Sequence, residues 1–355
     1  MRLVKHIIIS LTICLLPGVG SFYTQAAQSY APDDSLRFDD RPLRENLGLP
    51  NWFTLSFLDL NESLKEAIKN GKKGLIIYFG RKNCAYCKTL LEVNWGDPAI
   101  EKYTRKHFNV IAIDVTGART VTDFKGKTWR EREYSTHHKT NFTPTLVFYT
   151  EKGQQALKLP GYRPRYQFRA ALEYVADAHY NRESFRKYMA RAEAAMGFGS
   201  EELNEADFFT SPPYNLDRST PLPDNQQSKP LAVFFEHPRC HACDVLYGDT
   251  LTNPDIIRQL QKIEVVQLNT QLNTPVITPD GRRITSRQWA DELNLAFAPS
   301  VLFFDARGKE VLRIESVMRL YRLSNVLRYI TGKKYLQYPT FQSWLQEYRN
   351  QKINQ

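Results

Sequence analysis

The sequence lacks any long apolar run beyond its first residues. Its mean hydropathy is −0.48, and a membrane-spanning helix needs about 20 consecutive apolar residues. A multi-pass membrane protein is therefore excluded. Low-complexity tracts are also lacking, and 42% hydrophobic with 12% aromatic residues can fill ordinary cores, which excludes a wholly disordered or collagen-like chain. A length of 355 residues predicts two folded domains.

The one apolar run lies at residues 7–16, and it is too short to span a bilayer. Cations precede it and small residues follow it, ending at Ala26 and Ala27. This order is typical of a secretory signal peptide. It predicts a leader over residues 1–27 that is cleaved after Ala26 or Ala27, with an uncleaved anchor as the alternative. We therefore expect an exported, periplasmic protein.

Cysteine is scarce, with five residues in the chain, and the predicted leader contains one of them. The remaining four are Cys84, Cys87, Cys240 and Cys243, in two Cys-x-x-Cys pairs. An exported chain meets an oxidising compartment, where such short spacings favour disulfide chemistry over inert core positions. The two pairs leave no unpaired thiol in the mature chain.

The net charge is +10, and it falls to +8 once Arg2 and Lys5 leave with the leader. The remaining lysines and arginines are interleaved with acidic residues and form no basic arm or stripe. This pattern argues against nucleic acid as a partner. It favours solubility, with weak attraction to acidic partner proteins or to lipid headgroups as a peripheral membrane contact.

The two halves of the chain repeat each other. Cys240 follows Cys84 by 156 residues, and Pro299 follows Pro144 by 155 residues. A single one-residue gap aligns the halves over about 90 residues, the signature of a duplicated structural unit. We therefore predict two domains of one fold in tandem.

Each half contains the same series of expected elements. These are strands at 74–79 and 231–235, strands at 110–115 and 265–269, short helices within 128–140 and 285–295, and strands at 145–149 and 300–304. A further strand and a closing helix follow in each half. Strand and helix alternate and a hairpin follows, which predicts an α/β fold whose mixed central sheet is flanked by helices and has its parallel strands in the centre.

Composition also suggests the domain boundaries. They are an N-terminal extension at 28–50, a first domain at 51–196 that ends in one long amphipathic helix over 165–196, a proline-rich linker at 197–229, and a second domain at 230–355 with an extra C-terminal helix from Thr340. These limits are predictions from composition and periodicity.

Each Cys-x-x-Cys pair follows a predicted strand and opens a helical stretch. Free backbone N–H groups and the helix dipole at such a position stabilise a thiolate, so the pKa of the first cysteine falls. The second cysteine lies three residues on, within reach to close a disulfide and release a bound partner. This predicts Cys84 and Cys240 as attacking nucleophiles and Cys87 and Cys243 as resolving thiols.

The chain resembles the thioredoxin superfamily, most closely the exported thioredoxin-related proteins of the SoxW type. The residues that carry the resemblance are 78–88, 142–145 and Gly161–Tyr162 in the first half, with 234–244 and 297–300 in the second. The resemblance implies two tandem thioredoxin-like folds.

The resemblance further implies that Pro144 and Pro299 are cis prolines facing the cysteines. It implies that the backbone of Thr143–Pro144 and of Ala298–Pro299 binds a polypeptide substrate.

The chain also departs from the thioredoxin pattern. Tyr78 and Phe234 stand where a thioredoxin has a buried aspartate, which leaves open the group that handles the proton of the resolving thiol. Asn83 and Arg239 replace the tryptophan before the first cysteine. The Gly161–Tyr162 element has no sequence counterpart near Ser316, so the second domain is expected to differ in competence or in partner.

Residues within and beside the motifs are expected to modulate the two sites. His241 lies between Cys240 and Cys243, where a partly charged imidazole would stabilise the thiolate. Tyr86 in the first motif supplies no such charge, although Arg81 and Lys82 add a positive field. We expect the second site to be the more oxidising one, which would suit an electron relay between the domains.

Together these features predict a thiol-disulfide oxidoreductase that acts on protein substrates, needs no organic cofactor and exchanges electrons with another redox protein, such as a membrane electron donor. One alternative is a copper or zinc carrier in which His237, Cys240, His241 and Cys243 bind the metal. A second alternative is a non-catalytic module that binds client polypeptides. Covalent haem is excluded, because neither motif is followed by histidine.

Overall fold

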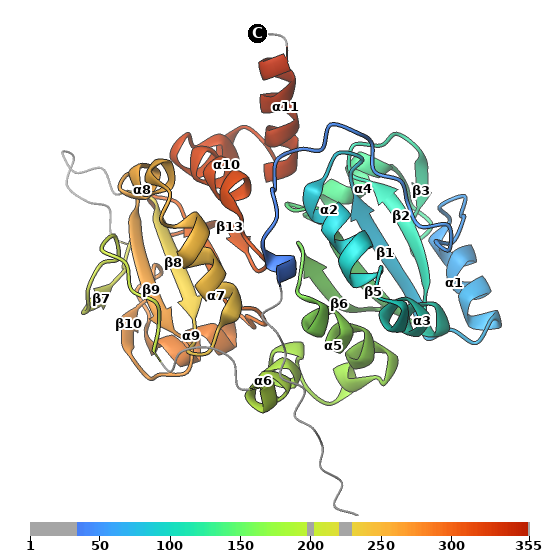
Figure 1. The fold of residues 1–355 in the computed structure, drawn as a ribbon, viewed down its shortest axis with the longest axis horizontal. Coiled ribbons are helices and arrows are strands. Elements are labelled where there is room, and N and C mark those ends of the chain that lie inside the picture. The colour runs from blue at the N-terminus through green and yellow to red at the C-terminus, as the bar shows by residue number, and fades with distance from the viewer. Residues whose placement is uncertain (1–33, 197–201, 220–228, 354–355) are drawn as a thin grey trace, which may run out of the picture. The chain divides into compact units, whose positions relative to one another are not determined.

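The structure is a computed structural model that describes residues 34–196, 202–219 and 229–353 (Figure 1). The predicted leader lies outside the described residues, together with parts of the predicted extension and linker. Export and leader cleavage therefore stay predictions. Among the residues described, no helix has the length and apolar character needed to cross a membrane.

The first half of the chain forms a mixed four-stranded sheet with helices on both faces (Figure 1). Its elements are α1 (Leu60–Lys69), β1 (Gly74–Gly80), α2 (Ala85–Thr89), η2 (Leu90–Asn94), α3 (Pro98–His107), β2 (Asn109–Asp114), β3 (Thr120–Thr122), β4 (Thr128–Arg130), α4 (Glu131–His137), β5 (Thr145–Thr150), β6 (Gln155–Pro160) and α5 (Arg165–Ala176). Alternate residues of β1 enter two different core clusters, one on each face of the sheet. Every residue of β1 is therefore buried.

The second half repeats this order. Its elements are β8 (Leu231–Glu236), α7 (His241–Val245), η4 (Leu246–Thr250), α8 (Pro254–Leu260), β9 (Glu264–Asn269), β10 (Pro275–Ile277), β11 (Arg283–Thr285), α9 (Ser286–Glu292), β12 (Ser300–Phe304), β13 (Glu310–Ile314) and α10 (Leu320–Thr331). The strand orders, β2-β1-β5-β6 and β13-β12-β8-β9, describe the same sheet. This confirms the predicted repeat and the α/β class.

The position of the parallel strands differs from the prediction. The parallel pairs are β1 with β2 and β8 with β9, and β2 and β9 are edge strands. The parallel strands therefore lie at one side of each sheet and not in its centre. The reason is that β5 pairs with the other edge of β1, and β12 pairs with the other edge of β8, both in the antiparallel direction.

The predicted long helix over 165–196 is wrong, because the chain breaks it into two. Helix α5 ends at Ala176, a 3-10 turn η3 covers His179–Asn181, and α6 covers Phe185–Met196. Ala178 adopts a left-handed conformation with φ of 55°, which a continuous α-helix does not allow. The two helices then pack against each other, which buries Phe185 in the first-half core.

The same break occurs at the end of the second half. Lys333 has a φ of 49°, η5 covers Lys334–Leu336, and α11 covers Phe341–Ile353. Helix α11 thus holds the place after α10 that α6 holds after α5. The predicted C-terminal helix from Thr340 is present, and it is the second copy of the last helix of the repeat.

The described part of the predicted linker packs on the second half. The Thr210 amide donates to the Val265 carbonyl at 2.8 Å, and β7 (Tyr214–Asn215) pairs with β10. The first half has the matching contact, since the Thr54 amide donates to the Val110 carbonyl at 2.8 Å. A short segment ahead of each sheet is therefore part of the repeated unit.

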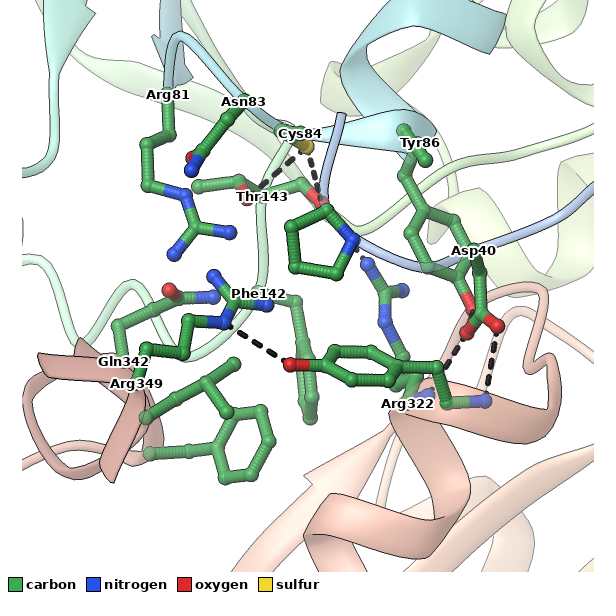
Figure 2. A pocket seen from close by; sticks show the side chains of 15 residues that line it. Asp40, Arg81, Asn83, Cys84, Tyr86, Phe142, Thr143, Arg322, Gln342 and Arg349 are labelled. Atoms are coloured by element: carbon green, nitrogen blue, oxygen red, sulfur yellow. Dashed lines mark hydrogen bonds between the residues drawn. The ribbon is translucent and has the colours of Figure 1, made fainter. Parts of the chain in front are cut away.

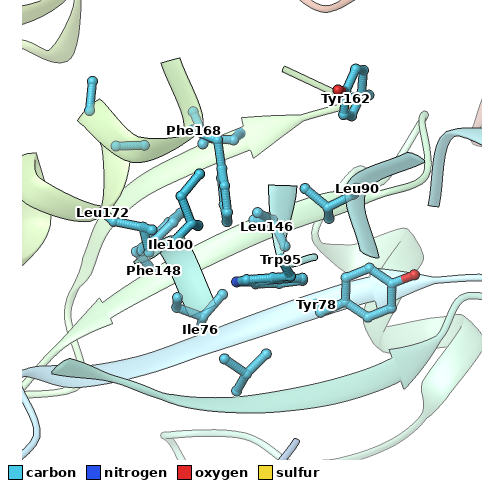
Figure 3. Packing of buried hydrophobic residues seen from close by; sticks show 14 of the residues in the cluster. Ile76, Tyr78, Leu90, Trp95, Ile100, Leu146, Phe148, Tyr162, Phe168 and Leu172 are labelled. Carbon is cyan, nitrogen blue, oxygen red and sulfur yellow. The ribbon is translucent and has the colours of Figure 1, made fainter. Parts of the chain in front are cut away.

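Trp95 lies at the centre of the first-half core (Figure 3). Its indole N–H donates to Thr104 Oγ1 at 3.1 Å, and its ring meets Tyr78 and Phe168 edge to face. Trp95 directly follows the π-helical turn η2, which continues α2. This core therefore holds the helix that begins after Cys84 against the sheet.

Candidate active site

The four predicted cysteines form two disulfides, Cys84–Cys87 and Cys240–Cys243. Each first cysteine is the N-cap of a helix, α2 or α7, and its Sγ accepts a backbone N–H from the second cysteine at 3.0 or 3.1 Å. Such a donor stabilises negative charge on the sulfur once the disulfide is reduced. All four cysteines are buried, with at most 7% of their surface exposed.

Each disulfide faces a cis-proline loop, as the thioredoxin resemblance implied. The Thr143–Pro144 and Ala298–Pro299 peptide bonds are both cis. Thr143 Oγ1 lies 3.2 Å from Cys84 Sγ and can donate to it, and the Thr143 carbonyl oxygen lies 3.6 Å from the same sulfur. Ala298 packs in one small cluster with Cys240 and Cys243.

The phenylalanines that precede these loops cross between the halves. Phe142 is buried in the core of the second half, where its ring centroid lies 5.4 Å from that of Phe341. Phe297 is buried in the core of the first half, and the guanidinium of Arg163 lies 4.6 Å from its ring centroid. In each half, the residue that precedes the cis-proline loop is therefore buried in the core of the other half.

The last helix of each half also contacts the other half. On α6, Arg186 forms an ion pair with Asp291 at 2.8 Å and donates to the Leu295 carbonyl at 2.6 Å. At the start of α11, the Phe341 amide donates to Asn141 Oδ1 at 3.0 Å. These contacts place α6 beside the second site and α11 beside the first.

The segments after β6 and β13 meet each other. The Val317 amide donates to the Tyr162 carbonyl at 3.1 Å, and Gly161, with a φ of 78°, leaves no room for a Cβ beside Ser316. Ser316–Val317 is thus the spatial counterpart of Gly161–Tyr162, although the sequence shows no similarity there. The two segments pair instead of standing free.

Tyr86, a predicted modulating residue, contacts the N-terminal end of α10. Its hydroxyl donates to Asp40 at 2.8 Å and accepts the Arg319 amide at 2.9 Å. Burial and the neighbouring Asp40 carboxylate raise the pKa of Tyr86, so the phenol stays neutral. Asp40 also accepts the amides of Tyr321 and Arg322 at 2.8 Å each, which caps the helix.

Arg322 closes the first site. Its guanidinium stacks on the Tyr86 ring at 3.3 Å from the centroid, and its Nη2 donates to the Thr143 carbonyl at 2.9 Å (Figure 2). Thr143 is the residue whose backbone the resemblance assigns to a bound polypeptide. In this structure a side chain of the second half is therefore hydrogen-bonded to the carbonyl oxygen of that residue. The sequence did not identify Asp40 or Arg322 as site residues.

The second site has different neighbours. His237 Nδ1 lies 2.7 Å from the Pro238 carbonyl oxygen, and its Nε2 lies 3.8 Å from a Glu193 carboxylate oxygen of α6. His241 is partly exposed at the start of α7. Throughout the described ranges, no three His, Cys, Asp or Glu side chains come together as a group that could hold a metal ion. The four residues of the metal-carrier alternative, His237, Cys240, His241 and Cys243, therefore do not form such a group in this structure.

Glu236 is a further candidate residue that sequence reasoning missed. It ends β8 just before the turn to Cys240, and it is fully buried, with hydrogen bonds from Tyr247 at 3.1 Å and from Gln267 at 2.9 Å. Burial raises its pKa to about 7. The available signal was an acid directly after an apolar strand. Gly80 holds the equivalent place in the first half, so the two sites differ here.

Replacing Glu236 with glutamine is expected to flatten the pH dependence of stability. Between its ordinary pKa of 4.5 and about 7, the folded chain holds a proton that the unfolded chain has released. The free energy of unfolding therefore falls as pH rises through this window, by about 3 kcal/mol in total at ~1.4 kcal/mol per pKa unit. Glutamine stays neutral and removes that fall.

Urea unfolding of both chains from pH 4 to pH 8 measures this effect. The exposed Glu347→Gln variant is the control and should keep the wild-type slope. If Glu236→Gln kept that slope as well, Glu236 would not be protonated in the folded chain.

Replacing Arg322 with glutamine is expected to open the first site alone. The variant loses the donor to Thr143, and a hydrogen bond from a charged group contributes ~1.5–3 kcal/mol. Reduction of Cys84–Cys87 by dithiothreitol should therefore become about tenfold faster or more, while reduction of Cys240–Cys243 keeps its rate. Alkylation followed by peptide mass spectrometry measures both disulfides in one sample.

Arg328→Gln is the matched control, because Arg328 is exposed on the same helix. Equal reduction rates for Cys84–Cys87 in wild type and Arg322→Gln would mean that Arg322 does not limit access to this disulfide.

Comparisons with known proteins give one family match and several similar solved structures. A family model described as a thioredoxin-like domain matches residues 60–176 and again 225–331. A thioredoxin-fold protein from Helicobacter pylori is 23% identical, with a TM-score of 0.31 over 36% of this chain and 83% of that one. A thioredoxin from Thermus thermophilus is 25% identical, with a TM-score of 0.27 over 33% and 83%.

A disulphide isomerase from Xylella fastidiosa is 18% identical, with a TM-score of 0.24 over 38% of this chain and 94% of that one. A search of curated proteins finds no match. The two matched regions of the family model coincide with the two halves of the repeat and together cover more than half of the chain.

Proposed function

Because the chain belongs to the family of thioredoxin-like domain proteins, we propose that it is a thiol-disulfide oxidoreductase that acts on protein thiols and disulfides through both Cys-x-x-Cys pairs. One observation supports this most directly. In each half, a disulfide at the start of a helix faces a cis-proline loop. The loop places backbone groups beside the disulfide, where an extended polypeptide could pair with them during exchange.

The proposed reaction begins at a reduced site. The thiolate of Cys84 attacks one sulfur of a substrate disulfide, forms a mixed disulfide and expels the other substrate sulfur as a thiolate. The thiolate of Cys87 then attacks Cys84 Sγ, which restores the Cys84–Cys87 disulfide and releases the second substrate thiolate. Two electrons pass to the substrate, and a partner thiol protein must return them. Cys240 and Cys243 take the same roles in the second site.

Glu236 is suited to accept and return the proton of the resolving thiol in the second site. It hydrogen-bonds to Tyr247, which lies one helical turn after Cys243. A carboxyl with a pKa of about 7 can accept or return a proton near neutral pH, as the resolving thiol requires. No acid occupies the equivalent place in the first half, so the two sites should differ in the pH dependence of their exchange rates.

Thiol exchange with a polypeptide at the first site requires the second half to move away. Arg322 donates a hydrogen bond to the Thr143 carbonyl oxygen, and Phe142 is packed against Phe341. We therefore place the described structure as a closed state, in which the two halves cover each other's disulfides. A polypeptide substrate would replace Arg322 at Thr143 with its own backbone N–H.

Variants that each keep one site test this function. Cys84→Ser/Cys87→Ser and Cys240→Ser/Cys243→Ser should each retain exchange with a protein disulfide such as that of insulin, and a chain with all four replacements should have none. Thiol trapping in glutathione buffers gives the midpoint potential of the remaining pair. Circular dichroism of each variant serves as the folding control.

The client-binding alternative makes the opposite prediction. If the chain with Cys84→Ser and Cys240→Ser kept its full effect on a polypeptide substrate, the cysteines would not carry the function.

Export forms part of the proposal, and the pattern of residues 1–27 supports it. N-terminal sequencing of the chain recovered from the periplasm of a bacterial host should begin at Ala27 or Gln28. A chain that stays in the cytoplasm and begins at Met1 would contradict export.

A further inference from the structure

A small cavity lies beside Cys84, between two arginines that come from different halves. Arg81 follows β1 and Arg349 lies on α11, and their guanidinium groups point toward one another (Figure 2). The cavity offers about 30 Å³ to the centre of a water-sized sphere, and Asn83 and Gln342 also line it. That space exceeds the ~10–15 Å³ needed by one water molecule.

The facing guanidinium groups have unused donors. Nε and Nη1 of Arg81 and Nη1 of Arg349 are buried and have no hydrogen-bond acceptor among the described atoms. Arg349 donates a hydrogen bond from its Nε to a hydroxyl, that of Tyr321, at 3.1 Å. Buried donors of a charged group are costly when they stay unpaired.

Two acids lie near these arginines, and both accept hydrogen bonds from other groups. Asp40 accepts from Tyr86 and from two helix amides, and Asp114 belongs to the end of β2 and accepts from Thr116. Arg322 adds a third positive charge at the cavity.

Burial and the charge of Arg349 together lower the pKa of Arg81 to about 9, and the charge of Asp114 acts in the opposite direction. Arg81 stays protonated at neutral pH, so like charges face each other across the cavity.

We propose that the cavity between Arg81 and Arg349 binds a small anion, either an inorganic oxyanion or the carboxylate of a small molecule. Guanidinium groups present planar pairs of N–H donors that match the oxygens of both kinds of anion. The volume of the cavity admits a group of a few atoms. An anion there supplies the missing acceptors and separates the two positive charges.

The site has a consequence for the neighbouring cysteine. Positive charge near Cys84 favours its thiolate once the disulfide is reduced. A bound anion cancels part of that charge, so it raises the thiol pKa and slows attack by Cys84. This consequence rests on the proposed function, whereas anion binding itself does not.

Thermal unfolding of the full chain in low-salt buffer tests the proposal. Sodium sulfate, sodium acetate or S-methylglutathione is added, with sodium chloride at equal ionic strength as the reference. The wild-type Tm should rise by about 3 °C or more above the reference with at least one of them. A response to sulfate alone identifies a free oxyanion as the ligand, and a response to acetate or S-methylglutathione identifies a carboxylate.

Arg81→Gln and Arg349→Gln should each lose that rise. Without added anion, each should have a Tm equal to or above that of the wild type, because one of two facing charges is gone. A purely structural arginine would show the opposite sign. Arg328→Gln is the control and should respond as the wild type does, and Arg81→Lys serves as the second variant if Arg81→Gln does not fold.

Two results would overturn the proposal. They are the absence of any anion-specific rise in the wild type, and an equal rise in Arg81→Gln and Arg349→Gln. The Cys84→Ser/Cys87→Ser chain should keep the rise, because the arginines and not the sulfur hold the anion. Failure of the redox proposal therefore leaves this test intact.

Discussion

The reciprocal burial of two phenylalanines holds the active-site faces of the two halves together. Phe142 enters the core of the second half and Phe297 enters the core of the first. Burial of one such side chain contributes about 1.5–3 kcal/mol, so the pair contributes roughly 3–6 kcal/mol to holding the halves together. Both residues directly precede the dipeptides that face the disulfides. The contact that joins the halves is thus the same contact that limits access to the cysteines.

The two halves bury their phenylalanines in the same way, but the polar groups around the two disulfides differ. At the first site, Asp40, Tyr86 and Arg322 form a polar network across the two halves, and none of its members is exposed. At the second site, the buried carboxyl of Glu236 has a pKa of about 7, and the ring of His237 lies against the Pro238 carbonyl in the turn that leads to Cys240. A closed state with a buried charged network at one site and a carboxyl that exchanges a proton near neutral pH at the other would let the two disulfides respond to different conditions.

Much of the fold could be predicted from the sequence, because the repeat and the strand pattern are local or periodic. The cysteine spacing and the prolines at 144 and 299 then indicated the candidate site, and the thioredoxin resemblance implied the cis geometry that the structure has. What could not be predicted depends on contacts between distant residues. Arg322 meets Thr143 across 179 positions, and a left-handed residue at Ala178 has no sequence signal in an otherwise helical pattern. Glu236 was visible as a charge after an apolar strand, but its burial follows only from the packing of Tyr247 and Gln267.

The proposed closed state requires that the first site bind a polypeptide only when the second half withdraws from it. A Cys87→Ser chain traps a disulfide-containing peptide on Cys84 as a stable mixed disulfide, and hydrogen exchange then reports on the amides of Tyr321 and Arg322, which Asp40 accepts in the closed state. Both amides should exchange markedly faster in the trapped complex than in the free chain. Unchanged protection of these two amides, with the peptide bound to Cys84, would contradict that requirement.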